Sequence, residues 1–259
     1  MNILFIGDIV GRPGREAINK LLPKLKKEYN LEFVVANAEN SAGGSGITAR
    51  VADELFSSGV DVLTSGDHIW KKQDIFELIN KDKRILRPNN YPEAAPGSGW
   101  GVFEAENGVK VGVINVNGRV FMDPLDCPFK SSLDAQQKIH RQTNIIIVDI
   151  HAEATSEKVA LGWFLDGKVS AVLGTHTHIQ TADDRILPEG TAYLTDVGMT
   201  GPCDSVIGRK VDNVLERFLT GVNMRFEIAE GNIQLQGAIV DVDQNTGQAK
   251  SIIRVQAKL

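Results

Sequence analysis

The chain has 259 residues, of which 42% are hydrophobic and 24% charged, and its formal net charge is -5 at pH 7. These values are ordinary for a globular protein, and the length allows a substantial buried core. The net negative charge argues against a non-specific binder of duplex nucleic acid, but not against an enzyme that acts on a small phosphate ester at a cationic metal centre.

The N-terminal sequence, MNILFIGDIVGR, contains only a short apolar run and no basic leader. It therefore predicts neither a signal peptide nor a membrane span, and no later segment reaches spanning length. The two cysteines, Cys127 and Cys203, lie far apart in the sequence and indicate neither a CxxC metal site nor a disulfide framework. We expect a cytoplasmic protein without a membrane partner.

The first 80 residues alternate between short apolar runs and helical patterns. Strands are expected over residues 2–6, 33–36 and 60–64, and helices over residues 16–29, 48–58 and 73–80. This rhythm predicts a parallel sheet with right-handed crossovers. Polar residues follow every strand, and these are Asp8, then Glu39 and Asn40, then Asp67 and His68.

Antiparallel pairing is expected after residue 100. Residues 87–100 are rich in Pro, Gly and Asn and predict a long loop. The pair Asn107-Gly108 then predicts a hairpin turn between strands over residues 101–106 and 109–116. The elements expected further along are an irregular segment over 119–130, helices over 131–141, 157–164 and 212–219, strands over 144–149, 171–173 and 191–194, a polar loop over 196–202, and strands within 223–255.

Two histidines separated by one residue follow the strand expected at residues 171–173. Gly174 allows a tight exit from this strand, and if the next segment is extended, His176 and His178 project to the same side. The pair alone fits two exposed loop histidines equally well. However, four of the five histidines in the chain, including His68 and His151, fall at the ends of expected strands. Because neutral imidazole is the commonest metal ligand, together they favour a metal site.

The strand ends collect carboxylates and imidazoles but no thiolate. This ligand set suits iron, manganese or zinc, whereas an all-oxygen set would suit magnesium or calcium better. Each residue taken singly also fits a structural role, such as a helix N-cap for Asp8 or a turn residue for Asn40. The full set exceeds what one ion needs, so we expect two divalent or mixed-valence metal ions, iron or manganese, with zinc or magnesium as alternatives.

The order of these motifs resembles that of the calcineurin-like metallophosphoesterases. The motifs of that family appear here in the order Gly7-Asp8, an acid after the second strand, Gly66-Asp67-His68, the lone His151, and GTHTH at residues 174–178. More narrowly, MNILFIGDIVGRPGR, NAEN, SGDHIW, DIHAEATSEK and LGTHTHIQTAD resemble the YmdB-like branch. The resemblance implies an α/β fold, a four-layer α/β/β/α sandwich with mixed sheets, in which residues 1–259 form a single metallophosphoesterase domain.

The resemblance also implies the metal ligands. One metal ion would be held by Asp8, Glu39, Asn40 and His178, and a second by Glu39, Asp67, His151 and His176, with Glu39 bridging the two. The broad family usually has a histidine where this chain has Val10, so Asn40 would complete the first set. It usually has an asparagine where this chain has Asp67, which lowers the formal charge of the site from about +2 to about +1 before hydroxide binds.

The function that the resemblance implies is a dinuclear metal-dependent phosphodiesterase that hydrolyses small phosphodiesters, 2',3'-cyclic nucleotides among them. A hydroxide bridging the metal ions would attack phosphorus in line, and His68, beside a ligand but not itself one, would protonate the leaving group as general acid. A phosphomonoesterase on the same site and a non-catalytic regulatory protein that binds metal or nucleotide remain alternatives. The expected partner is a small phosphodiester or nucleotide, and the sequence allows a homo-oligomer.

Two further features stay ambiguous at the level of sequence. The glycine-rich loop at residues 43–46 fits a phosphate cradle and a flexible connector equally well, because no GK[ST] follows it. Four arginines fit either substrate-facing cations or solvated surface, and these are Arg12, Arg15, Arg87 and Arg119.

Overall fold

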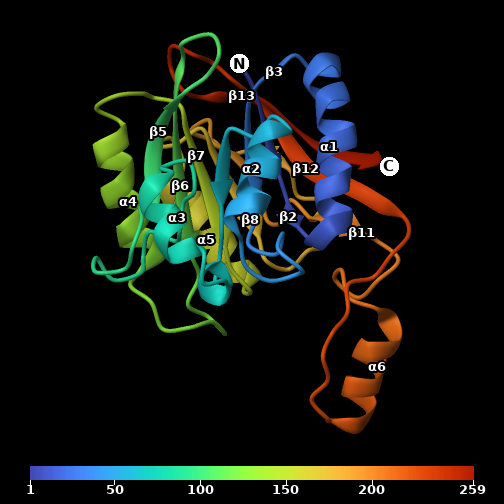
Figure 1. The fold of residues 1–259 in the computed structure, drawn as a ribbon. Coiled ribbons are helices and arrows are strands. Elements are labelled where there is room, and N and C mark those ends of the chain that lie inside the picture. Colours follow the sequence, from blue (N-terminus) through green and yellow to red (C-terminus); the bar gives the residue numbers. More distant parts are fainter.

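The computed structural model describes residues 1–259 and contains two stacked β-sheets with helices on their outer faces (Figure 1). The strands are β1 (Asn2–Ile6), β2 (Asp8–Ile9), β3 (Leu31–Asn37), β4 (Val62–Thr64), β5 (Trp100–Glu104), β6 (Lys110–Asn117), β7 (Ile146–His151), β8 (Ala171–Thr175), β9 (Arg185–Ile186), β10 (Ala192–Leu194), β11 (Met199–Pro202), β12 (Ile233–Val242) and β13 (Ala249–Lys258). The helices are α1 (Gly11–Glu28), α2 (Ala49–Ser57), α3 (Ile75–Lys81), α4 (Pro128–Ile139), α5 (Thr155–Leu165) and α6 (Val211–Thr220), with a 3-10 turn, η1 (Ile69–Lys71).

Both sheets are mixed, as expected. The first has the order β2-β11-β12-β1-β3-β4 with β13 paired to β12, and the second has the order β5-β6-β7-β8-β10-β9. The pairs β1·β3 and β3·β4 are parallel, as are β6·β7, β7·β8 and β8·β10. The expected hairpin is present as the antiparallel pair β5·β6. Since parallel strands end at the same edge of a sheet, most of the polar strand ends are brought to one side of the molecule.

Alternation along the strands builds three apolar layers. In β1, Leu4 and Ile6 pack in a cluster with α1, α2 and α3, whereas Ile3 and Phe5 pack between the two sheets. A third cluster lies between the second sheet and the pair α4 and α5. Helices therefore cover the outer face of each sheet, and Figure 1 shows α1 and α4 at opposite sides of the molecule. The expected four-layer α/β/β/α sandwich is confirmed.

The same alternation directs two polar side chains at the end of β7 into the space between the two sheets. Val148 and Ile150 contact the outer helical layer, and Ile147 contacts the layer between the sheets. Asp149 and His151 follow Ile147 at intervals of two residues and share its side of the strand. Both are completely buried.

Several expected boundaries were wrong. Helix α1 begins at Gly11 and not at residue 16, because Pro13 lies in its first turn, where a missing N–H costs nothing. Helix α4 likewise begins at Pro128, three residues before the expected start. Residues 199–202, expected as a loop, form β11 because they pair with β2 and β12. Residues 223–232, expected within strands, are largely irregular.

Between β11 and β12 the chain leaves the sandwich. Residues 203–230, here called the arm, carry α6 and project from the edge of the first sheet (Figure 1). None of the helices combines the length and the apolar character needed to cross a membrane.

Candidate functional site

All eight predicted site residues lie in one cluster at the carboxyl ends of the parallel strands. Asp8 belongs to β2, and the polar residues after β3 and β4 follow it across the first sheet. The second sheet contributes His151 at the end of β7 and the two histidines that follow β8. The site thus lies where the two sheets meet, at the carboxyl ends of their strands, which is the end at which α/β proteins commonly bind ligands.

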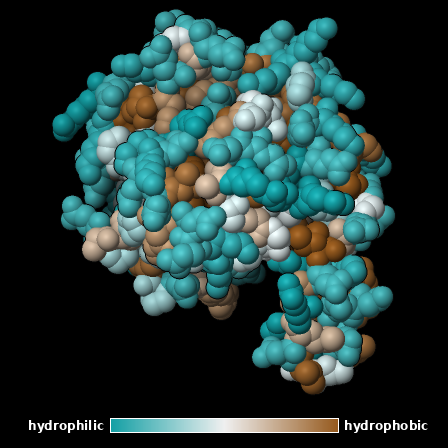
Figure 2. All heavy atoms as spheres, viewed as in Figure 1, coloured by the Kyte–Doolittle hydropathy of each residue, from teal (hydrophilic) through white to brown (hydrophobic).

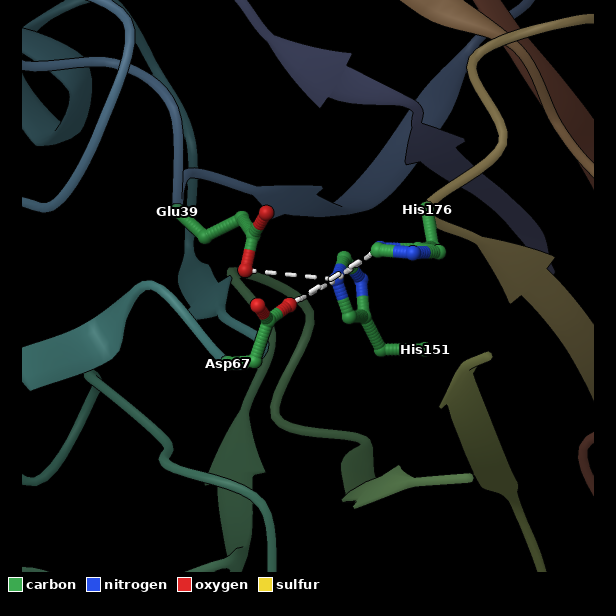
Figure 3. Close-up of side chains that lie close together, drawn as sticks. All are labelled: Glu39, Asp67, His151 and His176. Atoms are coloured by element: carbon green, nitrogen blue, oxygen red, sulfur yellow. Dashed lines mark hydrogen bonds and ion pairs between the residues drawn. The ribbon is translucent and has the colours of Figure 1, made fainter. Parts of the chain in front are cut away.

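Four of these residues, Glu39, Asp67, His151 and His176, each place one potential ligand atom within 4.8 Å of all the others (Figure 3). His151 Nε2 is 3.2 Å from Glu39 Oε2 and 3.4 Å from Asp67 Oδ1. His176 Nδ1 is 3.0 Å from the same nitrogen of His151. Two carboxylates and two imidazoles that converge in this way could hold a metal ion.

A second group continues from Glu39 toward the first sheet. His178 Nε2 is 3.6 Å from Asp8 Oδ1 and 3.3 Å from Asn40 Nδ2, and that amide nitrogen donates to Glu39 Oε1 at 3.0 Å. Glu39 therefore touches both groups, as a bridging ligand would. The amide oxygen of Asn40 instead faces His68 Nδ1 at 2.8 Å, so Asn40 would need to rotate its amide to offer oxygen to a cation.

The hydrogen bonding of the carboxylate oxygens in the cluster is that expected of metal ligands. Asp8 Oδ1 and Asp67 Oδ1 are buried and have no hydrogen-bond partner. A buried carboxylate oxygen is costly unless it is paired or coordinates a cation. The two oxygens belong to different groups of the cluster, and each faces an imidazole nitrogen at 3.4 to 3.6 Å without a hydrogen bond, so each group offers one carboxylate oxygen to a cation.

The chain matches the family model described as YmdB-like protein over residues 4–255. It belongs to the YmdB-like family. The family that the sequence motifs indicated is thereby confirmed.

Curated relatives match nearly the whole chain. The 2',3'-cyclic-nucleotide 2'-phosphodiesterase of Bacillus subtilis is 48% identical over 255 residues, which cover 98% of this chain and 96% of that protein. A putative phosphatase/phosphodiesterase of Mycoplasma genitalium is 36% identical and covers 100% of this chain, with 94% of its own length matched.

Solved structures match as well. A hypothetical protein from Thermus thermophilus superposes with a TM-score of 0.93 at 40% identity, covering 100% of this chain and 99% of that one. A crystal structure described as a novel phosphatase from Mycoplasma pneumoniae gives a TM-score of 0.93 at 35% identity, covering 100% and 93%.

The charges of the YmdB-like site balance one another in the absence of a cation. Burial opposes ionisation of Asp8, but His178 outweighs it and holds the pKa of Asp8 below its ordinary value. Burial likewise opposes protonation of His151, but Glu39 and Asp67 raise the pKa of His151 well above its ordinary value. Burial and the charge of His151 together lower the pKa of His176. Protonated His151 thus supplies part of the positive charge that the carboxylates require, and the pKa of His178 is raised by Asp8 in the same way.

The ring of His151 is oriented by residues that the sequence did not single out. Its Nδ1 lies 2.9 Å from Thr175 Oγ1, which donates to Asp149 Oδ1 at 2.7 Å. Burial raises the pKa of Asp149 to about 6, although Thr64 and Asn37 also donate to this carboxylate. This series of contacts leaves His151 Nε2 facing the cluster.

His176 has a comparable outer partner. Its Nε2 is 3.1 Å from Glu153 Oε2, while its Nδ1 faces His151 and Asp67. Glu153 therefore selects which ring nitrogen is presented to the cluster. The sequence contains a weak signal for this residue, an acid two positions after the strand-end histidine.

The expected extended geometry of the two histidines after β8 was wrong. The strand ends at Thr175, and His176 and His178 have φ angles of 95° and 65°, in the left-handed region that non-glycine residues rarely adopt. The turn therefore sends His176 to one group and His178 to the other. Thr177 between them donates its N–H and its hydroxyl to Asp196 Oδ2, at 3.1 and 2.6 Å.

Gly66 explains the glycine of the GDH motif. A Cβ atom at this position would overlap the ring of His151 and the carboxylate of Glu39. Only glycine allows the backbone to approach the cluster so closely.

The structure gives structural roles to the glycine-rich loop and to two of the four arginines. Gly44 and Gly46 donate their N–H groups to Asn40 O and Glu39 O, so the glycine-rich loop is closed on itself and is not an open phosphate cradle. Arg15 bonds to Glu54 and a backbone carbonyl, and the buried guanidinium of Arg87 bonds to carbonyls of its own loop. The other two arginines, Arg12 and Arg119, are exposed.

Proposed function

We propose that this chain is a dinuclear metal-dependent phosphodiesterase that hydrolyses small phosphodiesters, with 2',3'-cyclic nucleotides as the preferred class. The observation that carries the proposal is the single cluster of three carboxylates and three imidazoles, with one orphaned carboxylate oxygen in each of its two groups. The activity for which the Bacillus subtilis relative is named, at 48% identity, supports the substrate class.

The proposed ligands follow the two groups. Asp8, Glu39, Asn40 and His178 would hold one ion, and Glu39, Asp67, His151 and His176 the other. Mixed carboxylate and imidazole ligands favour iron or manganese over magnesium, with zinc as an alternative. Two such ions would supply Lewis acidity and an activated water for displacement at phosphorus.

His68 is the proposed general acid. It follows Asp67 directly and lines the cavity beside the cluster, and its side chain is 32% exposed, so a substrate can reach it. Its Nδ1 also faces Glu39 Oε1 at 3.3 Å, which leaves Nε2 available. In the proposed reaction Nε2 gives its proton to the leaving alkoxide oxygen as the bond from phosphorus to that oxygen breaks.

The proposal treats residues 1–259 as one metallophosphoesterase domain, because the layer between the sheets joins residues from Ile3 to Ile252. The cavity beside the cluster, about 600 Å³, suits a small phosphodiester and not duplex nucleic acid. Two unpaired thiols, Cys127 and Cys203, fit a cytoplasmic enzyme.

The deciding experiment measures metal content and hydrolysis of 2',3'-cyclic AMP on protein purified without chelator and reloaded with Mn²⁺. We expect about two ions per chain and turnover that disappears with chelation. Hydrolysis of p-nitrophenyl phosphate but not of bis-p-nitrophenyl phosphate would indicate a phosphomonoesterase instead. Tight nucleotide binding without hydrolysis in the metal-loaded protein would indicate a regulatory binding protein, and a chain without metal would overturn the proposal.

A further inference from the structure

The cavity beside the candidate metal cluster has a second wall that the proposed chemistry does not use. Five of the predicted site residues line one side of it, whereas the other side is formed by the arm. Figure 2 shows the arm as a lobe that stands clear of the sheets, with hydrophobic atoms at its tip. A bound phosphodiester would therefore lie between the cluster and the arm.

The base of the arm is joined to the site itself. Arg209 forms antiparallel bridges with Val206 and Ile228, so the two ends of the arm are paired. The carbonyl of Ile207 accepts a hydrogen bond from His178 Nδ1 at 3.0 Å. Through this hydrogen bond the arm orients the imidazole ring of His178, a proposed metal ligand. The same contact fixes the base of the arm beside the cluster.

Arg209 is a cation without an anionic partner. Its guanidinium is half-buried and lines the cavity, and its Nη2 donates to the carbonyl of Gly44. Burial lowers the pKa of Arg209, and no carboxylate acts in the opposite direction. The side chain is neither solvated surface nor part of an ion pair, which is the condition of a guanidinium that can receive an anion.

The rest of this wall is formed by residues of α6 and by Phe226. Val214, Arg217 and Phe218 line the cavity at the i, i+3, i+4 spacing of one helix face of α6. The guanidinium of Arg217 lies over the ring of Phe226, 5.3 Å from its centroid. Phe218 is 82% exposed, so its ring is accessible to a planar ligand. Planar groups of this kind are suited to stacking on a nucleobase.

We propose that the arm is the nucleotide-specificity wall of this site, in which Arg209 binds an anionic oxygen of the substrate phosphate and Phe218, Phe226 and Arg217 receive the nucleobase. This inference rests on the proposed phosphodiesterase function and extends it from a phosphodiester to a nucleotide. A substrate with its phosphorus at the cluster would reach the arm with its base.

The test compares 2',3'-cyclic AMP with ribose 2',3'-cyclic phosphate, which has the same ester but no base. Phe226→Ala should lower kcat/KM for the nucleotide about tenfold and leave the base-free ester unchanged. Arg209→Gln should lower kcat/KM for both substrates by about 10- to 100-fold, chiefly through KM, because both contain the phosphate.

Two variants on the same arm serve as matched controls. Arg225→Gln removes an exposed arginine and Leu219→Ala an exposed apolar side chain, and neither residue lines the cavity. Both should behave as the unmodified protein. If Phe226→Ala lowered kcat/KM equally for the two substrates, or if Arg209→Gln left kcat/KM unchanged, the proposed binding role of the arm would be wrong.

A separate measurement keeps this test independent of the proposed function. If the unmodified protein hydrolyses neither ester, the phosphodiesterase proposal fails. Calorimetry with adenosine 3'-monophosphate then tests whether the arm binds a nucleotide. We expect weaker binding in both Phe226→Ala and Arg209→Gln. Binding unchanged in both variants would overturn the proposed role of the arm.

Discussion

Lys158 Nζ lies 2.8 Å from Asp196 Oδ2, and both side chains are almost completely buried. Lys158 belongs to α5 and Asp196 follows β10, so the ion pair joins two elements of the second sheet and its covering layer. The same carboxylate oxygen accepts both hydrogen bonds from Thr177. The pair therefore holds the strained turn that presents His176 and His178.

Lys158→Met should destabilise the protein and loosen this turn. Removing one member of a buried pair leaves the Asp196 charge uncompensated, which costs about 3 to 5 kcal/mol of unfolding free energy. Denaturant unfolding measures this cost, and elemental analysis should show reduced metal content. Lys20→Met, at a lysine whose side chain is 58% exposed, is the control and should change stability by less than about 0.5 kcal/mol.

A double variant separates the stability of the pair from its positioning role. Lys158→Met combined with Asp196→Leu removes both charges and should recover much of the lost stability. Metal content should stay low, because the hydrogen bonds to Thr177 are gone. Full recovery of metal content would show that the pair does not position the histidines.

His68→Ala should lower turnover of 2',3'-cyclic AMP by about 100- to 10,000-fold, the usual contribution of a general acid. The leaving group of bis-p-nitrophenyl phosphate needs little protonation, so its hydrolysis should fall much less. Metal content should not change, because His68 is outside the proposed ligand sets. Unchanged turnover of a diester with a poor leaving group would exclude the role of general acid.

Asp67→Asn should keep metal binding and some activity. The amide retains an oxygen ligand but loses a negative charge, so the second ion should dissociate more readily during dialysis. Asp67→Ala removes the oxygen and should lose that ion. Complete loss of the second metal in Asp67→Asn, measured by elemental analysis, would mean that the charge of Asp67 is indispensable.

Removal of metal should make stability depend on pH in a defined direction. Without a cation, Glu39 and Asp67 raise the pKa of His151 well above 6.5 despite its burial. The proton on His151 then stabilises the folded chain fully below pH 6.5, the unfolded value, and this stabilisation is lost as pH rises through the folded pKa. The Tm of chelator-treated protein should therefore fall as the pH rises above 6.5, because the folded pKa of His151 lies above that value.

The metal-loaded protein is the comparison for this prediction, because bound cations neutralise the same carboxylates and its Tm should change much less over the same interval. Chelator-treated His151→Gln should lose most of the pH dependence. Identical profiles with and without chelator would contradict the assignment of the balancing charge to His151.

The core of the fold was predictable because local patterns and the tertiary structure agree. Strands β1, β3 and β4 and helices α2 and α3 lie close to the positions that apolar periodicity predicted. The pattern failed at β11, a four-residue strand that exists only because β2 and β12 pair with it. Such pairing depends on segments distant in the sequence and leaves no local periodicity.

The outer partners of the site were not predictable for a related reason. Glu153 is an acid in a loop whose only signal in the sequence is its place two residues after His151, and Asp149 is an acid in a buried strand. Their roles depend on a contact with His176 in one case and with Thr175 in the other. Arg209 was missed because nothing in the sequence indicates that the base of the arm lies against His178.

The sequence by itself determined which residue types stand at the carboxyl ends of the strands, and hence the family and the kind of site. The sequence could determine this because each strand ends where its apolar run stops and polar residues begin. The carboxyl ends of parallel strands then lie at the same edge of the sheet. Only the tertiary structure decided the left-handed turn at His176 and His178, the buried pair of Lys158 and Asp196, and the arm as a second wall. These features arise from packing between the two sheets and from the arm. They are stabilised by contacts between segments that are distant in the sequence, which no single segment contains.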